Sequence, residues 1–599
     1  MFSRRRILQT SFGAGSALGL SGLVPAWART AVEGNMGLRK NVKKIFNLSI
    51  GEFPVTINGR TGKAVGVNRS IPAPLVRFEE GEEIILNVKN TLKESSSIHW
   101  HGLLVPFPMD GVPGITFPGI APGETFQYKY AVPQNGTYWY HSHSGLQEQQ
   151  GHYGPIIIDP KMPDPVRYDR EYIMVLSDWT YENPHRIFSK LKSMSGSFNF
   201  QKKTIPDFFK EAKVMGFNKA ARQRAQWSRM RMSPADISDV TGASYTYLIN
   251  GRGTDDNWNG IFKPGERVRL RIINASAMSI FNVRILGLPM TIVASDGQNV
   301  QPFEVDEFQM GVAETYDVII EPTERKPYAF VAESIDRSGQ VVATFAPQLG
   351  MLAKAPKLRE KPHLTMKDMG MEGMDMKGME HAKMDMSDDL EDMDHAKMDM
   401  LSGIKRGPGV AHVAMNPVSR LHEPGIGLED AGHRTLKYTE LRSLSPNKDT
   451  RIHEREITLH LTSNMERYMW SFDGVKFSHV KESIKFYQGE RVRVTLINDT
   501  MMPHPIHLHG MFFHLVNGGG NHKPKKHTVI VKPGEKLSFD VSAEHVGDWA
   551  FHCHLLYHMH AGMFQVVSLL PKTVMKKPQT MMQMDHSKMD HSKMKGMKP

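Results

Sequence analysis

One pattern recurs three times along the chain, and this repetition limits the possible folds more than any other feature of the sequence. In each copy a Gly-Glu pair is followed by alternating apolar and polar residues, as in a half-buried β-strand, and the run closes on an asparagine. The three runs are EGEEIILNVKN, PGERVRLRIIN and QGERVRVTLIN, ending at Asn90, Asn274 and Asn498. A second shared run begins further along each copy, at Glu124, Glu314 and Glu535. The repetition predicts three copies of one all-β unit.

Histidines occupy corresponding positions in the first and third copies. Six, nine and eleven residues after the asparagine stand His504, His507 and His509 in the third copy, Ser96, His99 and His101 in the first, and Ile280, Val283 and Ile285 in the second. Seventeen residues after the glutamate stand His552, Cys553 and His554 in the third copy, His141, Ser142 and His143 in the first, and Val331, Ala332 and Glu333 in the second. The second copy is therefore predicted to be apolar at these positions and to hold no ligands.

Cys553 is the only cysteine of the chain, so it can form no intramolecular disulfide. An isolated cysteine is more often a small buried apolar residue, but histidine neighbours favour a metal ligand. Because alternate residues of a strand point to opposite faces, the thiol and the two flanking imidazoles can serve two different sites. A thiolate, two imidazoles and a weak thioether are the ligands of an electron-transfer copper. Cys553, His558, Met563 and His504 supply this set.

The other eight histidines form four His-x-His pairs, two in each outer copy. They are His99, His101, His141, His143, His507, His509, His552 and His554. Imidazole suits copper, iron and zinc alike. Four such pairs from homologous units indicate a metal cluster where the two units meet.

The motifs HWHG, HSH, HPIHLHG and HCHLLYHMHAGM, in this order, closely resemble those of three-domain multicopper oxidases. The resemblance implies an all-β fold of three cupredoxin-like Greek-key β-barrels and four copper ions per chain. It assigns His504, Cys553, His558 and Met563 to type 1 copper, His99 and His507 to type 2, and two triads to the type 3 pair: His143, His509 and His552, and His101, His141 and His554. It also implies that electrons pass from Cys553 through its neighbours to dioxygen.

Asp110, in PMDGVPG, stands where related oxidases keep an acid near the type 2 copper. The resemblance makes it a candidate proton relay; a turn-forming aspartate before Gly111 is the alternative. Some related cuprous oxidases have an acid directly after the second type 1 histidine, where this chain has Met559. That difference leaves a second proton route without a residue.

The start of the chain has the pattern of a twin-arginine signal. SRRRILQ precedes a weakly apolar run that closes on Ala26, Trp27 and Ala28, and this predicts export to the periplasm. No later run has the ~18 unbroken apolar residues that a membrane-spanning helix needs. The expected organisation is a signal peptide (1–28), cupredoxin domains at 40–165, 166–350 and 451–571, a Met-rich segment with a linker (351–450) and a Met/His-rich tail (572–599).

Methionine is over-represented, with 39 residues, of which eleven fall between Met366 and Met400 and seven between Met575 and Met597. MEHAKM at 379–384 recurs as MDHAKM at 393–398 and as two overlapping MDHSKM copies at 584–594. Thioethers select Cu(I), so these segments are predicted to bind additional copper; a solubilising linker is the alternative. With almost no other large apolar side chain, they are expected to be disordered without ligand.

These repeats resemble the copper-resistance (CopA-type) branch of the multicopper oxidases. Members of that branch are understood to oxidise Cu(I) and to bind additional copper. Met501, Met502 and Met559 lie close in sequence to the type 1 histidines and are candidates to receive Cu(I), with core packing as the alternative.

Residues 185–235 have helical spacing and basic character within the second copy. They predict an amphipathic helical insertion packed on the domain surface. A docking face, or a lid with copper-binding Met215, Met230 and Met232, is the alternative. The formal charge of +11 comes from scattered basic residues without a nucleic-acid-reading motif, so no nucleic-acid partner is expected.

The sequence thus predicts a periplasmic oxidase that couples oxidation of Cu(I) to reduction of dioxygen, in copper resistance. Two alternatives stay open: a laccase-like oxidase with a phenolic donor, and a copper-sequestering protein with secondary oxidase activity. Periplasmic copper-handling proteins are candidate partners.

Overall fold

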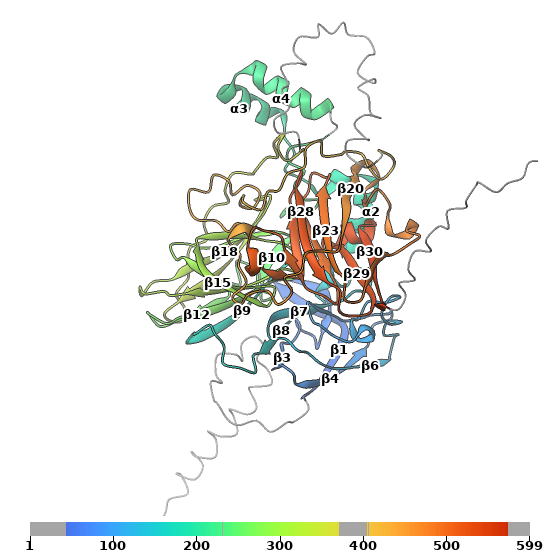
Figure 1. Ribbon diagram of the computed structural model, residues 1–599. Helices are drawn as coiled ribbons and strands as arrows, with labels where there is room; N and C mark the ends of the chain where they lie inside the picture. The colour runs from blue at the N-terminus through green and yellow to red at the C-terminus, as the bar shows by residue number, and fades with distance from the viewer. Residues whose placement is uncertain (1–43, 230–231, 371–403, 405, 573–599) are drawn as a thin grey trace, which may run out of the picture.

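The computed structural model describes residues 44–229, 232–370, 404 and 406–572 (Figure 1). These residues form three mostly β units, each built from two sheets that share a core. Among the described residues no helix is both long and apolar enough to cross a membrane. The predicted signal peptide and almost all of the predicted tail lie outside the described residues.

The N-terminal unit has sheets of order β2-β1-β4-β6 and β3-β8-β7-β5. Its strands are β1 (Lys44–Ile57), β2 (Arg60–Val67), β3 (Val76–Glu79), β4 (Glu83–Asn90), β5 (His99–His101), β6 (Thr125–Ala131), β7 (Gly136–His141) and β8 (Tyr153–Asp159). Two 3-10 turns, η2 (Phe107–Met109) and η3 (Glu148–Gln150), follow the histidine strands.

The middle unit has sheets of order β10-β9-β12-β17-β14-β15 and β11-β19-β18-β13-β16. Its strands are β9 (Arg170–Trp179), β10 (Thr246–Ile249), β11 (Asn259–Ile261), β12 (Val268–Asn274), β13 (Phe281–Ile285), β14 (Met290–Ser295), β15 (Gln298–Val305), β16 (Glu307–Met310), β17 (Thr315–Ile320), β18 (Tyr328–Ser334) and β19 (Gln340–Ala346).

The C-terminal unit has sheets of order β21-β20-β23-β28-β25-β26 and β22-β30-β29-β24-β27. Its elements are β20 (Arg455–Asn464), β21 (Met469–Phe472), β22 (Ile484–Tyr487), β23 (Arg491–Asn498), β24 (His504–Leu508), β25 (Phe513–Leu515), β26 (Lys525–Lys526), β27 (Thr528–Val531), β28 (Lys536–Ser542), β29 (Gly547–Cys553), α6 (Leu556–Ala561) and β30 (Phe564–Leu570), with 3-10 turns η7 (Met465–Arg467), η8 (Phe477–His479) and η9 (Gly520–His522).

The repeated asparagine explains why the three units share one topology. β4, β12 and β23 each pair with one parallel and one antiparallel neighbour and end on Asn90, Asn274 and Asn498. Each asparagine is fully buried, and its side-chain amide donates to two carbonyl oxygens from separate loops or strands at 2.8–3.2 Å. Each also accepts from the backbone N–H two residues on. A buried amide satisfied in this way fixes the turn that leads into the histidine strand.

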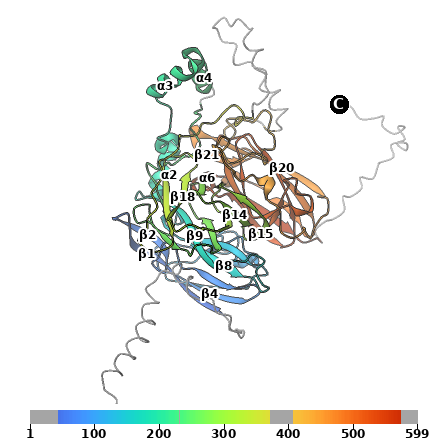
Figure 2. The same cartoon turned by 90° about the vertical axis from the view of Figure 1, so that its left-hand side faces the viewer.

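Four helical segments interrupt the middle unit between β9 and β10, as the basic insertion predicted: α2 (Pro184–Ser193), η4 (Ser195–Phe198), α3 (Ile205–Met215) and α4 (Phe217–Arg229). α2 packs on the body through Ile187 and Leu191. Figures 1 and 2 show that α3 and α4 instead stand clear of the sheets, and α3 buries none of its residues. The expectation of surface packing is therefore wrong for α3, whereas α4 packs through Trp227 in a cluster with Met369.

The chain between β19 and β20 contains no strand in its described part but contacts two units. It bridges to the middle unit at Val300↔Ser443 and Glu307↔Thr435, and to the C-terminal unit at Val418↔Glu535, with one 3-10 turn, η6 (Tyr438–Glu440). Met366 and Met369 belong to this stretch, and Met369 is buried against Trp227 and Met501. The expectation of disorder from Met366 onward is wrong for these first residues, because they pack in an apolar cluster. Residues 371–403 lie outside the described part.

Candidate metal centres

A thiol and two imidazoles meet inside the C-terminal unit. His504 begins β24, Cys553 ends β29 and His558 lies in α6. The Cys553 Sγ lies 3.4 Å from His504 Nδ1 and 4.0 Å from His558 Nδ1, and the two Nδ1 atoms are 3.3 Å apart. All three side chains are completely buried. Ligand atoms this close together can share one metal ion.

The second nitrogen of each imidazole in this group is held by a hydrogen bond. His504 Nε2 lies 2.7 Å from the Thr500 hydroxyl, and His558 Nε2 lies 2.7 Å from the Asp239 carboxylate, which comes from the middle unit. The Trp470 ring stacks on His558 with centroids 3.7 Å apart. These contacts orient both rings so that Nδ1 points toward the thiol.

Backbone hydrogen bonds hold the predicted fourth ligand, Met563, next to Cys553 and His558. The Cys553 N–H donates to the Met563 carbonyl, and the Met563 N–H donates to the His558 carbonyl, both at 3.1 Å. The Met563 side chain is fully buried. The four residues predicted for type 1 copper are thus neighbours in the fold.

The eight paired histidines converge where the N-terminal and C-terminal units meet. β5 and β7, with the second residue after β7, carry four of them; β24 and β29, with the residue that follows each, carry the others. Contacts that cross between the units are His99 to His509 (ring centroids 3.9 Å), His101 to His507 (3.8 Å), His143 to His552 (5.1 Å) and His101 to His554 (5.0 Å). The four pairs therefore form one cluster.

The hydrogen bonds of this cluster leave one nitrogen of each ring for a metal. His99, His507 and His552 use Nδ1 to reach the carbonyl oxygens of Asp110, His527 and Cys553, at 2.7, 2.7 and 3.0 Å. Because a carbonyl only accepts, Nδ1 carries the proton and Nε2 keeps its lone pair. The nitrogens without a partner among the described residues are Nε2 of His99, His141, His143, His507 and His554, and Nδ1 of His101. His509 Nε2 and His552 Nε2 face each other at 3.0 Å.

Buried nitrogens without partners are rare in proteins, so several aimed at one space indicate an absent ligand. An all-imidazole donor set beside a thiolate, two-imidazole and thioether set fits copper. The pKa values of the histidines also favour metal binding. Burial, reinforced by neighbouring histidines, lowers the pKa of His101, His141, His143, His507, His509 and His554 well below the ordinary value, and burial lowers that of His552 to about 4. Neutral imidazole is the form that binds metal.

Burial also raises the pKa of the Cys553 thiol well above its ordinary value. A buried thiol in apolar surroundings stays protonated unless a cation compensates the thiolate. A bound metal ion supplies that charge and deprotonates the ligand. Cys553 is therefore suited to bind metal rather than to act as a free nucleophile.

Asp110 lies directly against the histidine cluster. It follows η2, its carbonyl accepts from His99, and its Oδ2 lies 2.9 Å from His509 Nδ1 in the other unit. Its Oδ1 is buried and lies 3.3 Å from His99 Nδ1; because that nitrogen donates to the Asp110 carbonyl, Oδ1 has no hydrogen-bond partner in the described part of the chain. The turn interpretation holds as well, since Gly111 has φ +87° and a Cβ there would lie 1.8 Å from the Ile98 carbonyl.

Besides Asp110, three acid or histidine side chains that contact the motif histidines lie outside the motifs, and the sequence patterns do not identify them. Glu148 Oε2 lies 2.8 Å from His141 Nδ1, and burial, with Asp178 nearby, raises the Glu148 pKa well above its ordinary value. His527 Nδ1 lies 3.3 Å from His101 Nε2. Asp239 reaches His558 from the middle unit. The only signal in the sequence is that Glu148 follows the HSH motif closely; the other two depend on the tertiary structure.

A cavity of about 350 Å³ is lined by Asp239, Thr500 and Trp470, which contact the two imidazoles. Met232, Met501 and Met502 line it together with Asp236 and Asp239. Asp239 Oδ1 is buried and has no hydrogen-bond partner among the residues described. Two of the three predicted donor-side methionines thus share one cavity with Met232.

The remaining candidate methionines lie elsewhere. Met559 lines a separate cavity of about 760 Å³, together with His143. Met215 is at the end of α3. Met230 lies outside the described residues.

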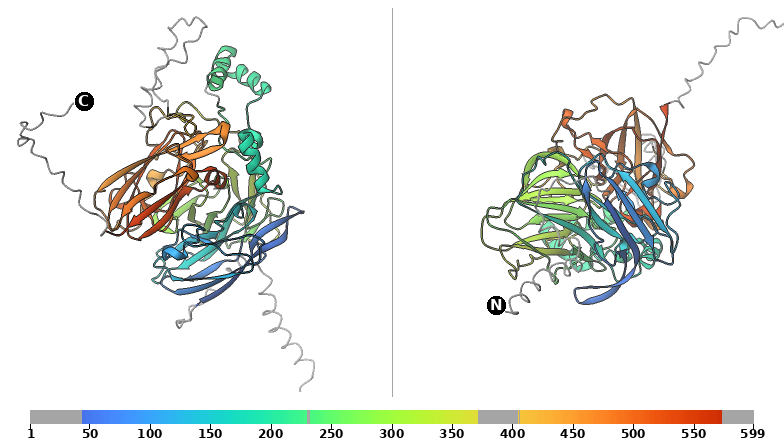
Figure 3. Two further views of the ribbon diagram at one scale, coloured as in Figure 1. Left: turned by 90° about the vertical axis from the view of Figure 1, so that its right-hand side faces the viewer. Right: turned by 90° about the horizontal axis from the view of Figure 1, so that it is seen from below.

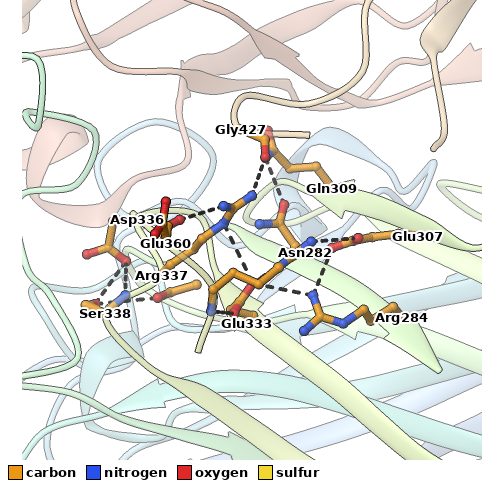
Figure 4. Close-up of polar contacts among 12 residues, drawn as sticks. Asn282, Arg284, Glu307, Gln309, Glu333, Asp336, Arg337, Ser338, Glu360 and Gly427 are labelled. Atoms are coloured by element: carbon orange, nitrogen blue, oxygen red, sulfur yellow. Dashed lines mark hydrogen bonds and ion pairs between the residues drawn. The ribbon is translucent and has the colours of Figure 1, made fainter. Parts of the chain in front are cut away.

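The middle unit carries charged residues near the positions where the outer units carry histidines (Figure 4). Glu333 of β18 corresponds to His143 and His554, and its Oε2 lies 2.6 Å from Arg359 and 3.4 Å from Arg284. The prediction that this copy is apolar here is therefore wrong for Glu333, whose charge is neutralised by arginines. In the described part of this unit no group of histidines or acids is arranged to hold a metal ion.

The comparisons with known proteins agree with this geometry. Multicopper oxidase family descriptions match residues 49–163, 170–349 and 452–572. Copper resistance protein A of Escherichia coli is 48% identical, over 87% of this chain and 92% of that protein. Copper resistance protein A of Pseudomonas syringae pv. tomato is 45% identical, over 94% and 98%.

Two solved structures share the fold. A laccase from Botrytis aclada matches with a TM-score of 0.63 and 20% identity, over 89% of this chain and 88% of that chain. Fet3p, a multicopper oxidase that functions in iron import, matches with a TM-score of 0.62 and 18% identity, over 88% and 90%. With three family matches and relatives that are 45% and 48% identical, the chain belongs to the multicopper oxidases, in the branch that contains copper resistance protein A.

Proposed function

We propose that this chain is a periplasmic copper-resistance oxidase that takes one electron from each of four Cu(I) ions and reduces dioxygen to water. The reaction balances with four protons: four Cu(I), one O2 and four H⁺ give four Cu(II) and two H2O. The observation that carries the choice of substrate is the cavity at Asp239, where thioethers and carboxylates lie beside a candidate type 1 ligand. Thioether sulfur selects Cu(I), and the names of the curated relatives support a role in copper resistance.

The proposal includes four copper ions per chain. Type 1 copper would bind His504, Cys553, His558 and Met563; type 2 copper would bind His99 and His507; the type 3 pair would bind His143, His509 and His552 on one side and His101, His141 and His554 on the other. Bound copper would supply the one-electron chemistry and the reduction of dioxygen, which no side chain can perform.

The polypeptide contributes a continuous path for the electron. His552 and His554 are the sequence neighbours of Cys553. The His552 ring lies near His509, whereas the His554 ring lies near His101. An electron that reaches the sulfur therefore has a short covalent path to both parts of the histidine cluster.

Asp239 connects the substrate cavity to the candidate type 1 site. Its Oδ2 accepts hydrogen bonds from His558 Nε2 at 2.7 Å and from the Tyr468 hydroxyl at 2.6 Å. Oδ1 has no hydrogen-bond partner among the described residues and would be the atom that binds a cation in the cavity, which Met232 and Met501 also line. Cu(I) held there would be separated from Cys553 by one carboxylate and one imidazole.

We assign proton delivery to Asp110. Reduction of dioxygen consumes protons, so an acid must lie against the cluster. Oδ2 of Asp110 orients His509, and Oδ1 is the atom left to hold a proton. Glu148 has a different role in this proposal, because its carboxylate fixes the tautomer of His141.

We further propose that the methionine-rich segments, which lie outside the described residues apart from Met366 to Gly370, bind additional Cu(I). The described residues on either side of 371–403 are close to the donor cavity. His412 lines that cavity, and its Nε2 lies 3.4 Å from the Met369 carbonyl. Copper collected by this segment would be released beside Asp239.

A phenolic donor is the second candidate, because the cavity of about 760 Å³ is lined by Phe188, Tyr468 and Phe564. Oxygen uptake, driven by Cu(I) or by a phenol, separates the candidates when the intact chain is compared with a chain lacking 371–403. Met366 to Gly370 are kept because they pack against the fold. We expect turnover of Cu(I) to fall several-fold in the shortened chain, with turnover of phenol unchanged.

Other outcomes would contradict the proposal. Unchanged Cu(I) kinetics with fewer bound copper ions would favour sequestration. Turnover of phenol alone, in both chains, would favour the laccase-like alternative.

A further inference from the structure

The helical pair α3–α4 exposes apolar side chains that a folded protein ordinarily covers. Ile205, Phe209, Val214 and Phe217 are 62–86% exposed. They lie on two helices that stand clear of the three sandwiches (Figure 3). Isolated exposed apolar residues are common, but four on one small projecting element indicate a contact surface.

The same helical pair is strongly basic. Residues 205–229 contain six lysines and arginines and two acids, a net charge of +4. Lys210, Lys213 and Lys219 are exposed beside the apolar side chains. Both acids are engaged within or near the pair: Asp207 caps α3, and Glu211 is paired with Lys203 and Arg224. The exposed surface is therefore suited to a partner that is acidic and carries apolar side chains.

A segment of this chain has that composition. Residues 371–403 contain ten acidic residues and three lysines, a net charge of −7, and their apolar side chains are almost all methionine. Flexible methionine side chains adapt to irregular apolar surfaces. Charge and apolar character are thus complementary on the two elements.

The segment also begins at the base of the helical pair. The Gln226 side chain of α4 donates to the Met366 sulfur at 3.3 Å. Trp227 of α4 packs in one cluster with Met369, and Met366 and Met232 pack against that cluster. The chain returns to the same place, since the Asn416 N–H donates to the Gly370 carbonyl at 2.8 Å.

The length of the segment is sufficient to reach the whole surface. α4 has 13 residues and is therefore about 20 Å long. A flexible chain of roughly 30 residues has an r.m.s. end-to-end distance of about 30 Å. Because the segment leaves the fold beside α4 and the chain returns to Gly370 at Asn416, the effective concentration of the segment at the helices is on the order of millimolar.

We propose that the surface formed by α3 and α4 is an intramolecular docking site for the acidic methionine segment 371–403. Lysines would pair with the Asp and Glu side chains, and methionines would cover Phe209, Val214 and Phe217. The docked segment would be held near Met232 and the donor cavity. This inference goes beyond the oxidase reaction, because docking requires neither Cu(I) nor dioxygen.

Labelling of an introduced thiol tests the proposal. Cys553 is fully buried and is the only native cysteine, so Val214→Cys adds one accessible thiol. The rate of maleimide labelling is compared, in copper-loaded protein at low salt, between the full chain and a chain in which a short Gly-Ser linker replaces 371–403. We expect labelling to be at least fivefold slower in the full chain.

The protection should depend on charge. It should disappear in 1 M salt, where the Debye length is about 3 Å, and on combining Lys210→Glu, Lys213→Glu and Lys219→Glu. A synthetic peptide of residues 371–403, added to the shortened chain, should restore it. Ile452→Cys, at a position that is 84% exposed in the C-terminal unit, is the matched control and should label equally in both chains.

Three outcomes would overturn the proposal. Equal labelling of the Val214→Cys thiol in both chains shows that the segment does not cover the helices. Protection that persists in the shortened chain and rises with protein concentration assigns the surface to a second copy. Protection that appears only with anionic phospholipid vesicles, whether or not the segment is present, assigns it to a lipid surface. Turnover of Cu(I) is measured separately, so the oxidase proposal can hold while docking fails.

Discussion

Six metal-facing histidines at these centres are oriented by a carbonyl or carboxylate oxygen that the other ring nitrogen contacts. Carbonyl oxygens orient His99, His507 and His552, whereas carboxylates hold His141, His509 and His558. A carboxylate partner both fixes the tautomer and increases the basicity of the ligating nitrogen. The carboxylates of Glu148, Asp110 and Asp239 should therefore affect metal binding more than their distance from the copper sites suggests.

Glu148 should determine how tightly the histidine cluster holds copper. Glu148→Ala removes the carboxylate at His141 Nδ1, leaving the Ser142 carbonyl at 3.1 Å, and should weaken copper binding by about 10- to 100-fold. Glu148→Gln keeps a side-chain acceptor, so its affinity for copper should stay within about threefold of that of the original chain. Copper content after dialysis against a graded chelator measures both, with Glu182→Ala, an exposed acid, as control. Equal losses from the Ala and Gln variants would assign Glu148 to packing only.

Replacing Asp239 should slow the oxidation of Cu(I) more than the oxidation of an organic donor. Asp239→Asn keeps the shape of the side chain but removes the charge that faces the cavity and supports His558. We expect kcat/KM for Cu(I) to fall by about tenfold or more, which corresponds to the ~1.4 kcal/mol lost when a charged contact becomes neutral.

Turnover of a phenol by the Asp239→Asn variant should change by less than about threefold. The reduction potential of the type 1 site should rise, because a nearby negative charge is lost. Asp236→Asn should leave that potential unchanged, because Asp236 lines the same cavity but its carboxylate accepts hydrogen bonds from Asn199 and Ser233 rather than from His558. If the Asp239→Asn variant oxidises Cu(I) as fast as the original chain, the site that receives Cu(I) lies elsewhere.

At the scale of elements, β29 shows why the repeat could be interpreted from sequence. Side-chain alternation along a strand follows from backbone geometry alone, so the opposite directions of Cys553 and its two histidines are fixed once the strand forms. The register His507↔His552 and Ile506↔Cys553 then aligns the histidines of β24 with those of β29. His99↔His141 does the same for β5 and β7.

Replacing the one cysteine should separate the two centres on β29. Cys553→Ser should abolish the intense visible absorption of type 1 copper and all turnover, with Cu(I) or with a phenol. The cluster of eight histidines should keep its metal, so copper bound by the folded sandwiches should fall from four ions to three. Ser142 already occupies the corresponding position in the N-terminal unit, which shows that serine fits such a strand. Residual oxidase activity would refute the proposed electron path.

For the helical insertion, by contrast, the packing could not be predicted from the sequence. Helical spacing in residues 185–235 predicts the helices, but not whether their apolar sides face the body or the solvent. α2 buries Ile187 and Leu191, whereas α3 buries nothing. An amphipathic pattern specifies a buried side only when a partner surface is within reach, and that depends on the position of neighbouring elements.

At the scale of the whole molecule, ion pairs join the middle unit to each of the two units that build the metal cluster. Glu171 of the middle unit contacts Arg77 of the N-terminal unit and, at 2.8 Å, Arg271 of its own unit. Lys526 of the C-terminal unit is fully buried, 3.1 Å from Asp296 and 3.0 Å from Glu314 of the middle unit. Removing one partner from such a pair leaves a buried charge without compensation. The middle unit therefore holds the two metal-bearing units in place although its described residues offer no metal group.

Glu171 should make stability depend on pH in the acid range. Burial alone would raise its pKa, but Arg271 and Arg77 outweigh burial and hold the pKa at about 2, below the ordinary 4.5. Its stabilising contribution is therefore complete above pH 4.5 and is lost as the pH falls toward 2. Glu171→Gln should lower the free energy of unfolding at pH 7 by on the order of 3 kcal/mol, and by much less at pH 2.

Denaturant unfolding at the two pH values measures the effect of Glu171→Gln. Glu52→Gln, which breaks an exposed pair with Lys63, is the control and should change stability by less than about 1 kcal/mol at either pH. An equal loss for Glu171→Gln at both pH values would show that packing, rather than charge, accounts for the effect.

The sequence by itself determined the repeated strands, the ligand types and the two-sided use of the strand at Cys553. These follow from local periodicity and from residues whose chemistry is independent of context, so they could be predicted from spacing. Only the tertiary structure decided that Asp239 reaches His558, that Glu148 and His527 join the histidine cluster, and that Glu333 is neutralised by Arg359. Those contacts join residues on different strands, loops and units, and their positions are set by the packing of whole sandwiches, which no local pattern records.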